Sequence, residues 1–314
     1  MEAKDAKGAP TLTVSNLSKT IGKTPIIKNI SFDLYPGEVF GFLGPNGSGK
    51  TTTIRMIVGL IRPTKGTVAI SGYNVQKQFV KAMRNIGSIV ENPEMYEYLS
   101  GWENLKQFQR MVKGITEERM HDVVTLVGMT NRIHDPVGTY SLGMRQRLGI
   151  AQALLNRPKV LILDEPANGL DPKGIREMRE FIRRLAEEEG LSVLVSSHLL
   201  SEIQQMCDRV AIISKGEVLA VDSVAHLLAE QGRIIWEVTP YEQGKQMIQG
   251  FMPLIDPKTT DLPAGQVAAV DDGTDLASVN DALVKAGVRV HRMERQLPAL
   301  EDLFLELTGG ESID

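Results

Sequence analysis

Residues 44–51 read Gly44-Pro45-Asn46-Gly47-Ser48-Gly49-Lys50-Thr51, with Thr52 next, and they match the pattern GxxxxGK(S/T). An apolar segment, 38–43, precedes this loop, and a helical pattern begins near Lys50. Glycines in such a loop let backbone amides approach phosphate oxygens, and the helix start adds partial positive charge. We therefore predict a phosphate-binding P-loop that places Lys50 on the β- and γ-phosphates of a nucleotide and Thr51 on Mg²⁺.

A second motif lies where the apolar segment 160–163 ends in two acidic residues, Asp164 and Glu165. Burying a carboxylate among apolar residues costs free energy, so such residues often mark a functional site. Beside a P-loop, Asp164 suits Mg²⁺, directly or through water, and Glu165 suits the water that attacks the γ-phosphate. Alone, the segment could also be a strand that ends in two solvated carboxylates. The P-loop alone indicates only a nucleotide triphosphatase or a kinase.

About twenty residues before Asp164, the chain reads Tyr140-Ser141-Leu142-Gly143-Met144-Arg145-Gln146-Arg147. By itself this segment could be an amphipathic helix with a serine N-cap. It resembles the LSGGQ signature, followed by QR, of the ATP-binding cassette (ABC) ATPase family; Ser141 and Gly143 match, whereas residues 140, 142 and 144 depart. The resemblance implies that residues 141–146 meet the γ-phosphate of an ATP bound by a second copy. Two shared ATP sites in a homodimer follow.

Two further segments resemble the family in the expected order. Asn168-Gly169-Leu170-Asp171-Pro172 is similar to the D-loop, and Ser196-Ser197-His198 is similar to the segment that carries the switch histidine. A lone histidine at a strand end is more often an ordinary packed side chain. Here the resemblance implies that His198 donates a hydrogen bond to the γ-phosphate and that Asp171 couples the two sites.

Two positions depart from the family pattern. The residue that usually stacks on adenine is aromatic, whereas Ile21 stands there, so we predict weaker discrimination between ATP and GTP. The glutamine that usually follows the strand at 86–90 is replaced by Glu91. A carboxylate at this Q-loop position could ligate Mg²⁺ more strongly but cannot donate a hydrogen bond.

The segments Glu91-Asn92-Pro93 and 300–308 resemble the bacitracin and lantibiotic exporter subfamily of ABC ATPases. This resemblance implies an ATP-hydrolysing subunit that powers export of a peptide antibiotic, a lantibiotic or another amphiphilic drug, giving self-immunity or resistance. It also implies separate transmembrane permease subunits as partners and a location at the cytoplasmic face of the cell membrane.

The overall composition restricts the class of protein. A chain of 314 residues with 42% apolar and 24% charged residues is ordinary for a globular protein. The net charge of -4 gives no broad basic field, so we expect no nucleic-acid partner. The single Cys207 excludes an intrachain disulfide. Neither a signal peptide nor a membrane span is evident, so a membrane function would require a partner.

The resemblance implies the fold class: an α/β P-loop NTPase domain of the ABC type, with a β-subdomain and a helical subdomain at about 100–156. Hydrophobic periodicity agrees with it, because the segment that follows residue 100 has a helical pattern. Unbroken apolar strands at 160–163 and 192–195, separated by a helix, indicate a buried parallel sheet. Strands at 234–238, 266–270 and 288–292 alternate with helices and predict a small α+β domain. The expected division is a flexible N-terminus (1–10), the ATP-binding domain (11–220) and a C-terminal accessory domain (221–314).

Two other classes of protein compete with a transport ATPase. A soluble ABC ATPase that acts on DNA or the ribosome would share the ATP chemistry, but the chain has neither coiled-coil heptads nor a second P-loop. A small-molecule kinase would have the P-loop but would leave residues 141–146 and His198 unexplained. A transport ATPase is therefore the favoured interpretation.

Overall fold

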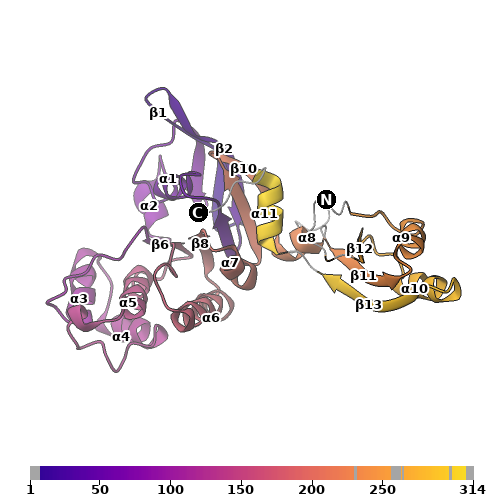
Figure 1. Cartoon of the computed structure of the whole chain (residues 1–314). Helices are drawn as coiled ribbons and strands as arrows, with labels where there is room; N and C mark the ends of the chain where they lie inside the picture. The colour runs from indigo at the N-terminus through magenta and orange to yellow at the C-terminus, as the bar shows by residue number, and fades with distance from the viewer. Residues whose placement is uncertain (1–7, 230–231, 256–262, 264, 297–298, 309–314) are drawn as a thin grey trace. The chain divides into compact units, whose positions relative to one another are not determined.

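The structure, a computed structural model, describes residues 8–229, 232–255, 263, 265–296 and 299–308. It divides the chain into two compact units, one that runs to Asp222 and a second that begins at Ser223 (Figure 1). Residues 1–7 of the expected flexible N-terminus lie outside the described residues. The first unit contains two β-sheets, and the second contains one.

The first unit contains an antiparallel sheet in the order β2-β1-β4-β5. Strand β1 (Leu12–Ile21) pairs with β2 (Thr24–Leu34) on one side and with β4 (Lys65–Ile70) on the other, and β5 (Tyr73–Asn74) extends the sheet. Alternate residues of β1 are buried because successive side chains of a strand point to opposite faces. This sheet forms the predicted β-subdomain.

A six-stranded sheet in the order β10-β9-β3-β8-β7-β6 forms the centre of the first unit. Its strands are β3 (Val39–Leu43), β6 (Ile86–Ile89), β7 (Val160–Asp164), β8 (Ser192–Ser197), β9 (Arg209–Ser214) and β10 (Glu217–Ser223). Strand β3 pairs in parallel with β8 and β9, and β7 pairs in parallel with β8 and β6. Every residue of β3, β7 and β8 is buried, as in sheets covered on both faces.

The two sheets share one apolar core. The rings of Phe32 on β2 and Phe40 on β3 stack with centroids 5.1 Å apart, and both belong to the same buried cluster. Helices α1 (Lys50–Ile57), α2 (Phe79–Met83), α6 (Pro172–Glu189) and α7 (Leu200–Met206) complete this part of the unit. Because parallel strands end at the same edge, the loops after β3, β7 and β8 open side by side.

Helices α3 (Gly101–Met111), α4 (Glu117–Leu126) and α5 (Leu142–Leu154), with the short 3-10 helix η1 (Val137–Thr139), form the predicted helical subdomain (Figure 1). Each α-helix begins at a hydroxyl N-cap, namely Ser100, Thr116 and Ser141. The Ser100 cap is a capping box with Glu103, which satisfies two of the free N–H groups at the helix start.

The second unit is a three-stranded antiparallel sheet in the order β12-β11-β13 with helices. Its elements are α8 (Val224–Ala229), β11 (Arg233–Thr239), α9 (Tyr241–Gln249), β12 (Gln266–Val270), α10 (Leu276–Lys285), β13 (Arg289–Gln296) and α11 (Leu300–Thr308). Alternate residues of β11, including Trp236, pack with Val279 and Leu283 of α10. The three predicted strands are confirmed, although β13 continues to Gln296.

The mixed α/β architecture agrees with the predicted fold class. Across the described ranges, no helix combines the length and the apolar character that a membrane span requires.

Candidate active site

The P-loop connects β3 to α1 by a path that two glycines permit. A Cβ atom on Gly44 would lie 2.3 Å from the carbonyl oxygen of Ile213, and one on Gly49 would lie 2.3 Å from Ile27 Cδ1. Gly49 is the N-cap of α1 with φ 107°, and no side chain caps this helix. The first N–H groups of α1 are therefore available to an anion such as a phosphate.

Lys50 is the buried cation of this loop, with 6% of its surface exposed. Its Nζ donates hydrogen bonds to the carbonyl oxygens of Gly44 at 2.6 Å and Pro45 at 3.4 Å, and lies 3.8 Å from Glu165 Oε1. Burial lowers the pKa of Lys50, while the charges of Glu165 and Asp164 oppose that shift. The Lys50 ammonium is thus hydrogen-bonded to two backbone carbonyl oxygens, which the oxygens of an approaching phosphate could replace.

Asp164 ends β7 directly opposite Ser196 on β8, and it is buried. The Ser196 hydroxyl donates a hydrogen bond to its carboxylate. Burial raises the pKa of Asp164, and hydrogen bonds from Ser196 and Thr51 partly offset that rise. A carboxylate beside the Thr51 hydroxyl is an oxygen donor set of the kind that Mg²⁺ prefers. The residues present therefore fit a magnesium ion, which would also favour the charged form of Asp164.

Glu165 follows Asp164 in a strained backbone conformation, with φ 51°. Its N–H group donates to the carbonyl oxygen of Ser196 at 3.2 Å and to the Ser196 hydroxyl at 3.1 Å. This turn directs the carboxylate to His198, whose Nδ1 lies 2.8 Å from Glu165 Oε2. Both side chains remain partly exposed, at 24% and 30%. A water molecule or a phosphate can therefore reach them.

The residues predicted for the signature begin helix α5. Ser141 is its N-cap, and the Ser141 hydroxyl accepts a hydrogen bond from the N–H of Met144 at 3.3 Å. Leu142 is exposed, Gln146 is buried, and Arg145 donates to Glu97 at 2.7 Å. The serine thus has the capping role that the sequence left open, while the start of the helix stays accessible.

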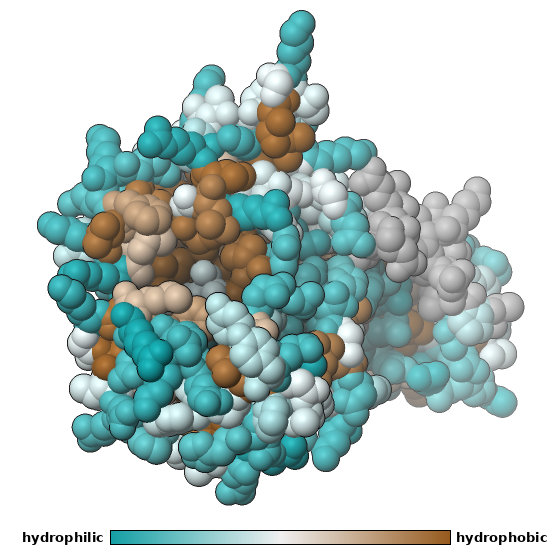
Figure 2. Space-filling view, turned by 90° about the vertical axis from the view of Figure 1, so that its left-hand side faces the viewer, coloured by the Kyte–Doolittle hydropathy of each residue, from teal (hydrophilic) through white to brown (hydrophobic). Residues whose placement is uncertain are grey.

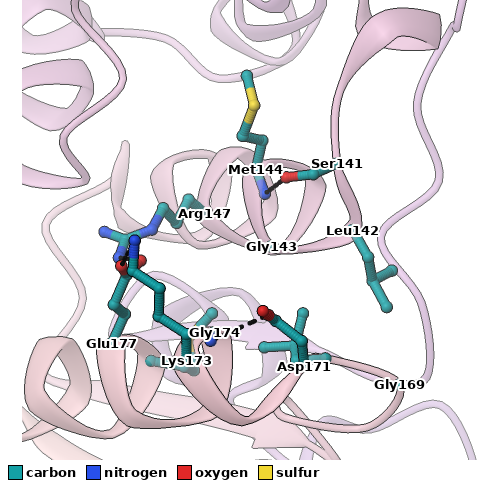
Figure 3. Close-up of a pocket in the computed structure, with 12 residues that line it drawn as sticks. Ser141, Leu142, Gly143, Met144, Arg147, Gly169, Asp171, Lys173, Gly174 and Glu177 are labelled. Carbon is teal, nitrogen blue, oxygen red and sulfur yellow. Dashed lines mark hydrogen bonds and ion pairs between the residues drawn. The ribbon is translucent and has the colours of Figure 1, made fainter.

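A cavity of about 280 Å³ lies between the start of α5 and the start of α6 (Figure 3). Arg147, Lys173 and Glu177 gather at one end, and Leu142 and Asp171 lie at the other. Asp171 is the N-cap of α6 and accepts a hydrogen bond from the N–H of Gly174 at 3.0 Å. No P-loop residue lines this cavity, although every residue of 44–52 is described. Within one chain, the P-loop and residues 141–146 therefore do not line the same cavity.

Besides residues 141–146 and Asp171, two more predicted site residues lie outside the group formed by Lys50, Asp164 and Glu165. Ile21 ends β1 and is 58% exposed, so it offers an open apolar surface. Glu91 has a left-handed backbone, with φ 67°, and forms an ion pair with Arg55 of α1. Its carboxylate is thus engaged by a cation rather than grouped with Asp164.

Ser196 is the residue of this site that sequence reasoning missed. It hydrogen-bonds both the Asp164 carboxylate and the Glu165 N–H group, so it fixes the end of β7. The sequence could have predicted its position from the apolar strands at 160–163 and 192–195. If these strands of equal length pair in parallel, the residues that follow them, Asp164 and Ser196, lie opposite each other.

Comparisons with known proteins agree with this geometry. The family model described as "ABC transporter" matches residues 27–168. The uncharacterized ABC transporter ATP-binding protein YhcH of Bacillus subtilis (strain 168) is 48% identical over 95% of this chain and 96% of its own length. The bacitracin transport ATP-binding protein BcrA of Bacillus licheniformis is 36% identical over 96% and 98%. The lantibiotic transport ATP-binding protein SrtF of Streptococcus pyogenes is 40% identical over 66% and 89%.

A solved structure gives the same result for the fold. The structure of cbiO1 from Clostridium perfringens, part of the ABC transporter complex cbiONQ, superposes with a TM-score of 0.65 and 26% identity. The match covers 70% of this chain and 91% of cbiO1.

Proposed function

The chain belongs to the family of ABC transporter ATP-binding proteins, and from this membership we propose that it is the ATP-hydrolysing subunit of an exporter. The proposed cargo is a peptide antibiotic, a lantibiotic or another amphiphilic drug. The support is the similarity, over nearly the whole chain, to a protein named for bacitracin transport. Export of such a compound would give the cell self-immunity or resistance.

The proposed chemistry rests on one observation, the contact of Glu165 with both Lys50 and His198. Glu165 orients the attacking water and accepts its proton. The water oxygen forms a bond to the γ-phosphorus while the phosphorus–oxygen bond to the ADP leaving group breaks. Lys50 exchanges the Gly44 carbonyl for phosphate oxygens, and the open start of α1 receives the same anion. His198 leaves Glu165 and donates a hydrogen bond to the γ-phosphate.

Magnesium would be held by Thr51 and Asp164 in this proposal. When bound, the ion neutralises charge on the phosphate oxygens. The Ser196 hydroxyl holds the Asp164 carboxylate in place by a hydrogen bond, and the Thr51 hydroxyl also hydrogen-bonds this carboxylate.

We propose that two copies of the chain close around two ATP molecules. Residues 141–146 of one copy then meet the γ-phosphate on the P-loop of the other, and Asp171 couples the two sites. The exposed start of α5 supports this arrangement, because Ser141 and Leu142 stay accessible and no P-loop residue lines the cavity beside them (Figure 3).

The membrane path would come from a separate permease subunit, with this chain bound at the cytoplasmic face of the membrane. Leu60, Phe79 and Val80 are exposed apolar side chains near the end of α1 and the start of α2. The side of the molecule on which α1, α2 and α3 lie carries a hollow rich in apolar side chains (Figure 2). We propose that the permease docks on this surface.

We also propose that residues 11–220 carry the ATP chemistry and that residues 221–314 serve as an accessory domain.

Co-purification tests the transporter proposal. Tagged Glu165→Gln protein is purified from membranes with ATP and Mg²⁺, and bound proteins are identified by mass spectrometry. A multi-span membrane protein among them supports the proposal, and loss of that partner on Phe79→Asp substitution supports the docking surface. Recovery of ribosomes or DNA instead would favour an ABC ATPase that acts outside transport.

A further inference from the structure

Two helices follow the proposed catalytic residues along the chain, and a charged pair joins them. Helix α6 follows the turn at Glu165, and α7 follows His198. Arg179 of α6 lies with its Nη1 3.7 Å from Glu202 Oε2 of α7. The two side chains are only 19% and 21% exposed, and Arg179 also donates a hydrogen bond to Gln205 of α7. This pair is therefore largely enclosed between the two helices.

The pair borders the residues that flank Glu165 and His198. A cavity of about 10 Å³ is lined by Pro166, Ala167 and Ser197 on the side of the strand ends, and by Arg179 and Glu202 on the side of the helices. This volume is at the lower limit for a single water molecule. The charged pair thus lies directly behind the two loops that carry the proposed catalytic side chains.

Glu202 Oε2 is buried and makes no hydrogen bond within the part of the chain that the structure describes. At 3.7 Å from Arg179 it has an opposite charge nearby but lacks a hydrogen bond. A buried carboxylate oxygen in this state destabilises the fold, and a well-packed apolar side chain would avoid that cost. Stability alone therefore gives no reason for the pair.

The turn at Glu165 gives a functional reason. Its left-handed backbone is unfavourable for a residue other than glycine and persists only where the surroundings fix it. Ser196 fixes the turn from the side of β8. We propose that Arg179 and Glu202 are a positioning pair that fixes it from behind, by holding α6 and α7 at the separation that keeps Glu165 beside His198.

The inference rests on the proposed roles of Glu165 and His198, and it predicts a specific kinetic effect. The nucleotide phosphates would be bound by the P-loop between β3 and α1, which are different elements from α6 and α7. Loss of the pair should therefore lower kcat and leave ATP affinity unchanged. A purely structural role would instead lower thermal stability and affinity together.

The experiment is a double-mutant cycle on the full chain. Glu202→Gln keeps the shape of the side chain, Arg179→Gln keeps its polar character, and each removes one charge. We expect each single substitution to lower kcat about tenfold, because a misplacement of about 1 Å can cost about a hundredfold and a smaller displacement costs less. The Kd for ATP should stay within about twofold, and the double variant should lose about tenfold rather than a hundredfold, because both residues act through one contact.

Asp208→Asn is the matched control. It removes a different ion pair of α6, in which Arg183 donates to Asp208 at 2.8 Å, next to β9 rather than behind the catalytic loops. We expect its kcat to stay within about twofold of the wild type. The inference is overturned if Glu202→Gln behaves like this control, or if the two single effects multiply in the double variant.

The outcome also separates this inference from the proposed function. If Glu165→Gln abolishes turnover while Glu202→Gln does not change it, the catalytic proposal stands and the positioning pair is wrong. Should Glu202→Gln fail to fold, Arg179→Lys is measured in its place, because it keeps the charge but loses the planar geometry. A fall in kcat at constant ATP affinity then supports the inference, and an unchanged kcat overturns it.

Discussion

His198 Nδ1 lies 2.8 Å from Glu165 Oε2, so the side chains that follow two neighbouring parallel strands touch each other. The contact uses the Nδ1 atom of His198, and the proposal has His198 leave Glu165 to donate a hydrogen bond to the γ-phosphate. Binding of ATP would exchange one partner of His198 for another. The exchange links the presence of the phosphate to the position of the catalytic carboxylate.

Substitution His198→Ala removes this link. We expect turnover to fall about a hundredfold, because a positioned hydrogen bond to the reacting phosphate is lost, while ATP affinity falls less than about threefold. Steady-state kcat and an equilibrium Kd for ATP check the two expectations separately. His134→Ala, in the helical subdomain, is the control and should turn over normally; near-normal turnover of His198→Ala would contradict the assigned role.

Substitution Lys50→Ala acts on binding. The ammonium is the buried cation of the P-loop, and a charge-assisted hydrogen bond contributes about 1.5–3 kcal/mol. We expect the Kd for ATP to rise roughly 10–150-fold. The exposed Lys159→Ala serves as the matched control in the same titration. Equal affinities for the two variants would show that Lys50 is not the phosphate ligand.

Substitution Asp164→Asn should stabilise the fold and abolish activity. Burial raises the pKa of Asp164 above its ordinary value of 3.8. The folded state therefore retains this proton more firmly than the unfolded state. The stabilisation is complete below pH 3.8 and is lost as the pH rises through the higher folded-state pKa. At pH 7 the buried negative charge is thus a cost that asparagine removes.

For Asp164→Asn at pH 7 we expect Tm to rise by roughly 2–4 °C, which corresponds to about 1 kcal/mol. The difference from the wild type should shrink as the pH falls toward 4, and turnover should drop at least about a hundredfold. Thermal unfolding at several pH values checks the sign. A Tm below that of the wild type at pH 7 would mean that the hydrogen bond from Ser196 outweighs the cost of burial.

Substitution Glu91→Gln tests whether this carboxylate is a metal ligand. The structure pairs it with Arg55, so we expect the Mg²⁺ concentration for half-maximal turnover to change less than about twofold. Because the ion pair is exposed, Tm should change little. An increase of more than about fivefold in the required Mg²⁺ would instead place Glu91 at the metal.

Much of the active site follows from sequence because its residues occupy strand ends. Asp164 and Glu165 come directly after one buried strand, and His198 comes directly after the next, so parallel pairing brings them together. Lys50 follows from the glycine pattern. The single cysteine, Cys207, is buried, and burial raises the pKa of its thiol.

The contacts between helices could not be derived in the same way. Arg179 and Glu202 each lie on a helix rich in polar residues, where a charged side chain ordinarily faces water. Only the packing of α6 against α7 encloses them. The same holds for Glu91, whose partner Arg55 lies 36 residues earlier and faces it only once α1 and the segment after β6 are in place. Local patterns specify strand ends but not side-chain partners on separate helices.

The most direct test of the account is ATP turnover and ATP binding by Glu165→Gln in the full chain. The substitution keeps the shape of the side chain but removes the carboxylate that accepts the proton of the attacking water. The account predicts turnover at least about a hundredfold below the wild type, with ATP affinity within about threefold and an ATP-dependent dimer. Turnover near the wild-type rate would contradict it, because Glu165 would then not be the residue that activates water.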